Sequence, residues 1–142
     1  MDKLEILVVE DNDNDVELLT VTLKYINLQN NVSRVKDGQE ALDYLFCQNK
    51  YNGRNPCKSP GLILLDLRLP KLDGLEVLRT IKSDNRTKDI PVIVMTSSDY
   101  PLDAKESYQY GTSWYIVKPV TLESFVTAIS GIGFKWTIFN KE

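Results

Sequence analysis

The sequence predicts an α/β protein whose 142 residues form one domain with a doubly wound, five-stranded parallel sheet. Two observations support this prediction. Short runs are apolar at every position, and longer segments with apolar residues at helical spacing alternate with them. A run that is apolar throughout is typical of a strand buried on both faces, as in a parallel sheet covered by helices.

Three central strands are predicted where four consecutive residues are apolar, at residues 6–9, 62–65 and 92–95. Another strand is predicted at residues 114–117, which read Trp-Tyr-Ile-Val. Residues 32–35 alternate weakly between apolar and polar side chains. That weaker pattern suits a strand at the edge of the sheet, where one side is open to water.

Five helices are predicted in the segments that separate or follow these strands, because their apolar residues recur at helical spacing. Asp37 is a capping candidate for the second helix, and Asp73-Gly74 precedes the third. Pro101 is expected to begin the fourth helix and Gly111 to end it. The apolar stripes of the other four are Val16, Leu19, Leu23 and Ile26; Ala41, Leu42, Leu45 and Phe46; Leu75, Leu78 and Ile81; and Leu122, Phe125, Val126 and Ile129.

Composition excludes several classes of function. The chain has no histidine, which removes imidazole bases, catalytic triads and phosphohistidine carriers, and its two cysteines cannot form a four-cysteine zinc site. The net charge of −3 argues against general binding of nucleic acid, which depends on an excess of basic side chains. The N-terminus lacks a signal-peptide pattern and no apolar run could span a bilayer, so we expect a cytoplasmic protein without a membrane partner.

Polar residues stand at the end of four predicted strands. Because the carboxyl ends of parallel strands share one edge of the sheet, these side chains should converge on one crevice. Any single polar residue there is best explained as the start of a loop, but four such sites together favour a functional site. The residues are Glu10 and Asp11 after the first strand, Asp66 after the third, Thr96 and Ser97 after the fourth, and Lys118 after the fifth.

Three carboxylates in one crevice repel one another and require a counter-charge, which Mg²⁺ would supply with its preference for oxygen ligands. A lysine beside them suggests a second anion, most simply a phosphoryl group. An aspartate can attack phosphorus and form an acyl phosphate. The cluster therefore indicates phosphoryl chemistry on an aspartate.

Four motifs resemble the receiver domain of two-component response regulators. They are Val8-Val9-Glu10-Asp11, the segment from Leu64 to Gly74 with Asp66 and Asp73-Gly74, Met95-Thr96-Ser97, and Tyr115-Ile116-Val117-Lys118-Pro119. The resemblance covers about residues 4–130 and implies a flavodoxin-like sheet with strand order 2-1-3-4-5, for which the chemotaxis member of this family is a known example. It also implies that the protein is not an enzyme but a signalling domain, phosphorylated by a sensor histidine kinase.

The resemblance assigns roles to individual residues. Asp66 would accept the phosphoryl group, and Mg²⁺ would be held by Glu10, Asp11, Asp66 and the backbone carbonyl of Arg68. Thr96, Ser97 and Lys118 would bind the phosphoryl oxygens. Thr96 and Tyr115 would form a switch that changes the surface of the fourth helix and fifth strand. The Lys118–Pro119 peptide bond is expected to be cis.

Some residues depart from the common pattern of that family. The acidic pair is Glu-Asp instead of Asp-Asp, Ser97 replaces the usual Ala, and Arg68 stands two residues after the nucleophile. Two other readings remain: a degenerate receiver that only binds partners, and an Asp-nucleophile phosphohydrolase. The phosphohydrolase requires an Asp as general acid at the position of Arg68, which argues against it.

Residues 47–60 form a long polar insertion, and residues 131–142 form an aromatic extension. Both features resemble the subgroup related to cyanobacterial phytochrome response regulators, which implies a phytochrome-like kinase. The extension is too short for a DNA-binding module, so output should pass through a protein surface to a downstream partner. Phe134, Trp136 and Ile138 alternate with polar residues. They would either pack on their own domain or contribute to a homodimer interface.

Overall fold

In this computed structural model, the structure describes residues 5–26, 32–54, 59–69, 71–97, 105 and 108–132. Five strands are present: β1 (Ile6–Val9), β2 (Val32–Val35), β3 (Leu62–Asp66), β4 (Val92–Thr96) and β5 (Trp114–Val117). The helices are α1 (Asp13–Tyr25), α2 (Gly38–Leu45), α3 (Gly74–Ser83) and α5 (Leu122–Gly131), with a short 3₁₀ helix, η2 (Asn49–Tyr51). Every strand predicted from the sequence is confirmed, and β3 and β4 each extend one residue further, to Asp66 and Thr96.

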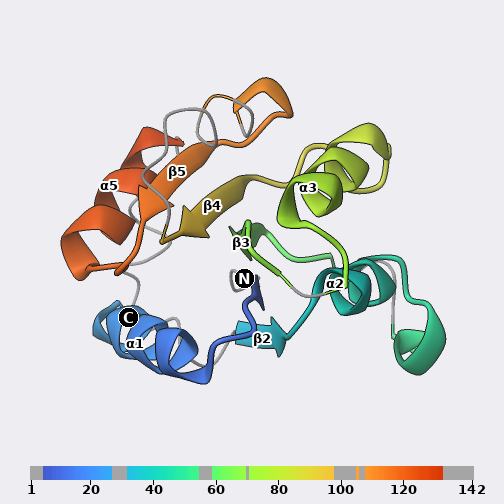
Figure 1. The fold of residues 1–142 in the computed structure, drawn as a ribbon, viewed down its shortest axis with the longest axis horizontal. Helices are drawn as coiled ribbons and strands as arrows, with labels where there is room; N and C mark the ends of the chain where they lie inside the picture. The colour runs from blue at the N-terminus through green and yellow to red at the C-terminus, as the bar shows by residue number, and fades with distance from the viewer. Residues whose placement is uncertain are drawn as a thin grey trace.

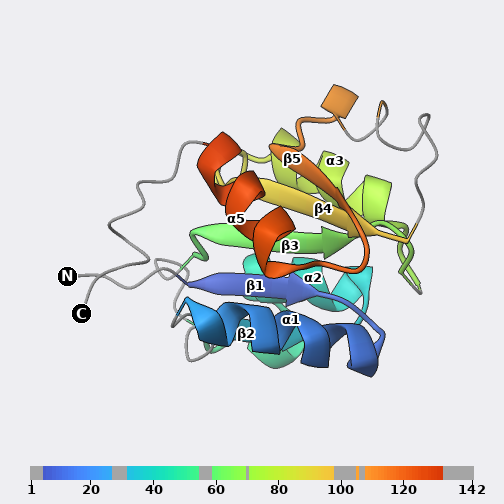
Figure 2. The ribbon, with the colours of Figure 1, turned by 90° about the vertical axis from the view of Figure 1, so that its left-hand side faces the viewer.

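The five strands form one sheet in the order β2-β1-β3-β4-β5, and all neighbours are parallel (Figure 1). This order confirms the predicted fold class. β1 pairs with β2 on one side and with β3 on the other, so the order reverses at β1. In Figure 2 the arrowheads of β1 and β3 lie at the same end of the molecule. Ligands of doubly wound sheets bind beyond that end, at the reversal.

Helices cover both faces of the sheet, with α1 and α5 on one side and α2 and α3 on the other (Figure 1). The strand residues divide accordingly, because successive side chains of a strand point to opposite faces. Ile6, Val8 and Leu64 pack with Phe125 in the cluster beneath α1 and α5. Leu7, Val9, Ile63 and Leu65 instead pack beneath α2 and α3. This division explains why the central strands are apolar at every position.

Side chains cap the starts of the helices, as the sequence predicts for Asp37. The side chain of Asp37 accepts a hydrogen bond from the backbone N–H of Glu40 at the start of α2. Asp73 accepts one from the N–H of Leu75 at the start of α3. Asn12 caps α1 by accepting from the N–H of Asp15. Each side-chain oxygen satisfies a backbone donor that has no partner inside its helix.

The described part of the insertion, residues 47–54, packs against α2. The hydroxyl of Tyr51 donates to Glu40 Oε2 at 2.7 Å, and the ammonium of Lys50 lies 2.9 Å from the same oxygen. Arg54 Nε donates to the carbonyl of Tyr44, and its guanidinium lies 4.0 Å from the centre of the Tyr44 ring. These contacts fix η2 on the side of α2.

Several sequence expectations fall outside the described residues. One of them is most of the fourth helix, which is expected from Pro101 to Gly111. Of that segment, residues 105, 108 and 109 are described as helical. The packing of the aromatic residues in the extension is another. Within the described ranges, no helix has the length and apolar character needed to cross a bilayer.

Candidate functional site

The predicted site residues lie at one edge of the sheet because they terminate parallel, aligned strands. Glu10 and Asp11 directly follow β1, Asp66 is the last residue of β3, and Thr96 is the last residue of β4. Lys118 follows β5, and its backbone N–H donates to the carbonyl of Thr96 at 2.8 Å. Glu10, Asp66 and Thr96 are all buried, at 1%, 4% and 1% exposure.

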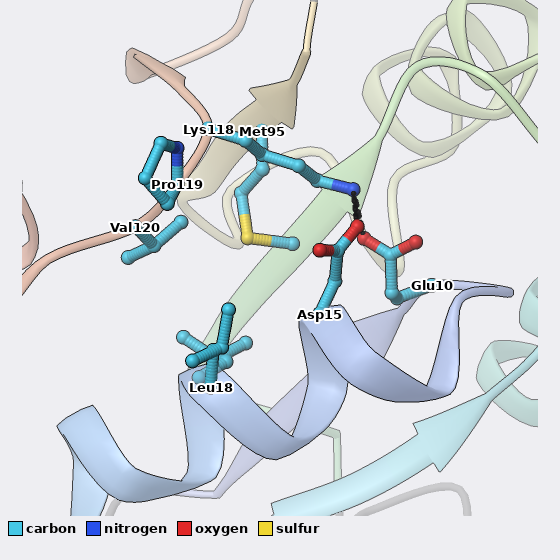
Figure 3. Close-up of a pocket in the computed structure, with 8 residues that line it drawn as sticks. Glu10, Asp15, Leu18, Met95, Lys118, Pro119 and Val120 are labelled. Atoms are coloured by element: carbon cyan, nitrogen blue, oxygen red, sulfur yellow. Dashed lines mark hydrogen bonds and ion pairs between the residues drawn. The ribbon is translucent and has the colours of Figure 1, made fainter.

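Lys118 contacts three carboxylates of the site through its ammonium group. Its Nζ lies 2.5 Å from Glu10 Oε1, 2.8 Å from Asp15 Oδ2 and 3.0 Å from Asp66 Oδ2. Figure 3 shows this side chain reaching toward Glu10 and Asp15, which project from the β1–α1 junction. The site therefore joins the ends of β1, β3 and β5 and the first turn of α1 through one ammonium group.

Burial and charge oppose each other in this cluster. Loss of solvent around Glu10 raises the pKa of its carboxyl to about 7, assisted by the charge of Asp66 and opposed by the hydrogen bond from Lys118. Burial lowers the pKa of Lys118, but hydrogen bonds to Asp15, Glu10 and Asp66 outweigh it and hold that pKa above its ordinary value. The lysine is therefore firmly protonated.

Three carboxylates could hold a divalent cation together. One ligand oxygen each from Glu10, Asp11 and Asp66 lies within 4.8 Å of the others. Glu10 and Asp66 are buried, whereas Asp11 is exposed and leaves the cluster open to solvent. A hard cation such as Mg²⁺ prefers oxygen ligands of this kind and retains water on its open side. The donor set thus fits the expected metal.

Asp66 is oriented by a backbone group as well as by Lys118. The N–H of Arg68 donates to Asp66 Oδ1 at 3.0 Å, while Oδ2 faces Lys118. The loop that carries Arg68 is held by Gly74, whose N–H donates to the carbonyl of Leu67 at 3.1 Å. A Cβ on Gly74 would lie 2.4 Å from Leu67 Cα, so only glycine fits there. This close approach explains why a glycine follows Asp73 in the second motif.

The remaining predicted residues occupy different surroundings. Ser97 and the side chain of Arg68 are exposed at the rim. Tyr115 is half-buried and packs against the cluster beneath α2 and α3, which includes Val94. Tyr115 pairs with Val94 across the sheet, two residues before the pairing of Thr96 with Val117. The Lys118–Pro119 peptide bond is cis.

Sequence reasoning missed Asp15. Within the run of Asp and Asn at residues 11–15, the side chain of Asn12 caps α1 by accepting from the N–H of Asp15. Asp13 pairs instead with Arg34, and Asp15 pairs with Lys118. A signal was available: Asp15 precedes Leu19 and Leu23 by four and eight residues, on the helix face that packs inward.

A small apolar pocket adjoins the charged cluster. It lies between α1 and the segment that follows β5, and Figure 3 shows Leu18, Met95, Pro119 and Val120 around it. Glu10, Asp15 and Lys118 form its polar end. The apolar surroundings remove water from that side of the ammonium and strengthen its electrostatic interactions.

Comparison with known proteins finds a match to the family described as "Response regulator receiver domain" over residues 6–130. The chain is 35% identical to the probable methanogenesis regulatory protein FilR2 of Methanothrix harundinacea, covering 99% of this chain and 88% of the relative. It is 37% identical to the response regulator Rcp1 of Synechocystis, covering 92% of this chain and 87% of that protein.

Solved structures agree with the sequence relatives. The bacteriophytochrome response regulator RtBRR superposes with a TM-score of 0.88 at 42% identity, covering 99% of this chain and 84% of that one. The phosphorylated cyanobacterial phytochrome response regulator RcpA gives 0.79 at 36% identity, covering 99% and 96%. The Mn²⁺-bound form of Rcp1 gives 0.77 at 33% identity, covering 99% and 97%.

Proposed function

The chain belongs to the response regulator receiver domain family, and from this premise we propose that it accepts a phosphoryl group on Asp66 and signals to a protein partner. The observation that carries the proposal is the contact of Lys118 with Asp66, in a buried site that also holds Glu10 and faces Asp11. A carboxylate nucleophile, a cluster for a cation and a fixed ammonium are the parts that phosphoryl transfer to aspartate requires.

Mg²⁺ is the cofactor we propose, held by Glu10, Asp11, Asp66 and the backbone carbonyl of Arg68. When bound, it would neutralise the carboxylates and the phosphoryl oxygens. The donor geometry supports this assignment, as does the Mn²⁺-bound form of Rcp1 among the relatives. Mg²⁺ and Mn²⁺ favour the same oxygen ligands.

The proposed reaction is a displacement at phosphorus. A carboxylate oxygen of Asp66 forms an O–P bond while the P–N bond of a phosphohistidine breaks, and the imidazole nitrogen retains the electron pair. The donor histidine must belong to the partner, because this chain contains no histidine. Lys118 and Thr96 would each donate a hydrogen bond to the transferred phosphoryl oxygens, and Ser97 stands at the rim for the same purpose.

The partner that supplies the phosphoryl group is proposed to be a sensor histidine kinase. Its relation to a phytochrome is supported by RtBRR and RcpA, whose names place them in phytochrome signalling. The match to FilR2, a regulator of a different process, shows that resemblance of this degree extends to other signalling systems. We propose a kinase of the phytochrome type because the 42% identity to RtBRR exceeds the 35% identity to FilR2.

Signal output is proposed to pass through the face that includes β5. In the phosphorylated state the hydroxyl of Thr96 would move toward the phosphoryl group, and Tyr115 would fill the space that it leaves. Val117 and Tyr110 are exposed on the described part of that face, at 43% and 38%. A change in the packing of Tyr115 would thus alter a surface that a protein partner could read.

Hydrolysis of small phosphate esters is the function that the site supports less well. A phosphohydrolase with an aspartate nucleophile requires a general acid two residues later, and Arg68 occupies that position. Its guanidinium does not release a proton at neutral pH, so it cannot act as that general acid. We therefore propose that the protein accepts a phosphoryl group and does not turn over phosphate esters.

The proposal is tested by intact mass after incubation with acetyl phosphate and Mg²⁺. We expect one phosphoryl group on the wild type, none in the presence of a chelator, and none on Asp66→Asn. The matched control is Asp89→Asn, which makes the same change at an exposed position before β4. Equal phosphorylation of Asp66→Asn and the wild type would contradict the assignment.

A further inference from the structure

Asp15 contacts Lys118 but does not belong to the proposed metal cluster. It lies in the first turn of α1, and its side chain is 34% exposed. Its Oδ2 lies 2.8 Å from Lys118 Nζ. The cluster that could hold a cation contains Glu10, Asp11 and Asp66 and does not include Asp15. Asp15 therefore interacts with the lysine and not with the proposed metal.

The three contacts of Lys118 use all of its donors. An ammonium group has three N–H bonds, and Glu10, Asp15 and Asp66 each accept from Nζ at hydrogen-bond distance. A phosphoryl oxygen on Asp66 could receive a hydrogen bond from Lys118 only if one of these carboxylates gave up its own. Phosphorylation therefore requires an exchange of partners at Lys118.

Asp15 is the partner that is released at the lowest cost. The side chains of Glu10 and Asp66 are 2% and 6% exposed, so a carboxylate there that lost its hydrogen bond would remain poorly solvated. Asp15 stands at the open side of the site and can turn its carboxylate to water. A surface carboxylate loses little free energy by such an exchange.

We propose that Asp15 is a positioning residue that holds Lys118 in the unphosphorylated state and must release it to the phosphoryl group. The inference rests on the proposed function and adds a determinant of phosphoryl affinity. Two effects of Asp15 weaken the binding of the phosphoryl group. The Asp15 carboxylate competes with the phosphoryl oxygen for Lys118, and its negative charge repels the negative phosphoryl group. Its removal should favour the phosphorylated state.

The test compares the affinity of the Mg²⁺-loaded protein for beryllium fluoride, an analogue of the phosphoryl group, by calorimetric titration. We expect Asp15→Asn to bind the analogue about three- to tenfold more tightly than the wild type, as suits a partly exposed charge pair. Asp15→Glu should return the affinity toward that of the wild type. Mg²⁺ affinity measured without the analogue should change much less, because Asp15 is not a proposed ligand.

Asp13→Asn is the matched control, since it removes the same charge from the same helix turn. Asp13 pairs with Arg34 and is 79% exposed, so its loss should leave the affinity for beryllium fluoride unchanged. The ¹⁵N resonance of the Lys118 ammonium gives a second readout, which should shift in Asp15→Asn and not in Asp13→Asn.

Three outcomes would overturn the inference. Unchanged affinity in Asp15→Asn would mean that Asp15 does not compete for the lysine. An equal gain in Asp13→Asn would assign the effect to overall charge. If the wild type binds Mg²⁺ but neither beryllium fluoride nor a phosphoryl group, the proposed function fails together with the inference. The first two outcomes leave phosphorylation of Asp66 intact, so the two failures are distinguishable.

Discussion

Lys118 shows how one residue can serve two states of a site. With no cation bound, its ammonium offsets the repulsion among buried carboxylates, and three hydrogen bonds fix its position. A bound cation would assume that compensating role at Glu10 and Asp66, which share the cluster with Asp11. The lysine would then bind the phosphoryl group once Asp15 releases it. Both roles need a positive charge at the end of β5.

Replacement of Lys118 should separate these two roles. We predict that Lys118→Ala binds Mg²⁺ at least as tightly as the wild type, because a competing positive charge has been removed. Phosphorylation by acetyl phosphate should fall to a small fraction of the wild-type rate, because the phosphoryl oxygens lose a charged donor. Calorimetric titration measures the first quantity and intact mass the second.

Lys88→Ala is the control, since Lys88 is exposed beyond α3 and should affect neither measurement. A Lys118→Ala variant that loses Mg²⁺ binding would show that the ammonium organises the carboxylates. A variant that is phosphorylated at the wild-type rate would exclude Lys118 from phosphoryl binding.

At the scale of elements, the junction between β3 and α3 positions the nucleophile. Asp66 ends the strand, and the loop returns so closely that a Cβ at residue 74 would collide with Leu67 and the carbonyl of Asp66. The helix then begins at once, capped by Asp73. The loop that carries Arg68 is thus held between the strand end and the helix start. Its geometry depends on the absence of a side chain at residue 74.

We predict that Gly74→Ala destabilises the fold by about 1–3 kcal/mol, the usual range for an added group in a close-packed place. Its Cβ would approach the carbonyl oxygen of Asp66 to 2.6 Å, so the loop must shift and phosphorylation should slow as well. Gly53→Ala is the control, because a Cβ at Gly53 meets no heavy atom within 4 Å. Urea unfolding measures the difference, and equal stability of the two variants would contradict the predicted clash.

The contact between α2 and η2 makes the stability of the fold depend on pH through Glu40. Burial raises the pKa of Glu40, but hydrogen bonds from Tyr51, the Lys36 N–H and Lys50 outweigh it and hold that pKa at about 2. Because the folded-state pKa lies below the ordinary value of 4.5, the carboxylate stabilises the fold above pH 4.5. That contribution is lost as pH falls toward 2.

We therefore expect Glu40→Gln to lower the free energy of unfolding at neutral pH and to weaken the contact of η2 with α2, which Arg54 still supports through Tyr44. The difference from the wild type should shrink between about pH 4.5 and pH 2, as the wild-type carboxylate takes up its proton. Unfolding by urea across this pH range gives the comparison, with Glu17→Gln as an exposed control on α1. A difference that stays constant with pH would mean that the charge of Glu40 contributes nothing.

For the whole molecule, the sheet separates two layers that phosphorylation would affect differently. Asp15 and the apolar pocket lie on the side of α1 and α5, where Met95 lines the pocket. Tyr115 packs on the side of α2 and α3. A phosphoryl group at the sheet edge would therefore act on α1 through Lys118 and on the face near β5 through Thr96 and Tyr115. Both routes begin at strand ends.

We predict that beryllium fluoride with Mg²⁺ shifts the backbone amide resonances of β5 and its neighbours, including Tyr115 and Val117. Residues at the opposite edge of the sheet, such as those around η2, should shift much less. In Tyr115→Ala the changes at Val117 should be reduced while those at Asp66 persist, because binding remains and the switch is lost. Identical spectra of the β5 face with and without the analogue would contradict the proposed switch.

The sequence alone determined the fold class, the five strands, four helix stripes and the cap at Asp37. These features depend on local periodicity and on side chains bonding to nearby backbone, which a single stretch of sequence contains. It also determined that polar groups gather at one sheet edge, because parallel strands align their carboxyl ends. The residues proposed for metal and phosphoryl binding follow from that rule together with the family motifs.

Only the tertiary structure decided which of these groups contact one another. Lys118 is separated from Asp15 by 103 residues and from Glu10 by 108. No periodicity reveals such a pair. The pKa of Glu10 likewise depends on burial beneath other elements, and the docking of η2 depends on Glu40 across the helix surface. Local sequence sets where each side chain can point, but partners and solvent exposure are set by the packing of distant segments.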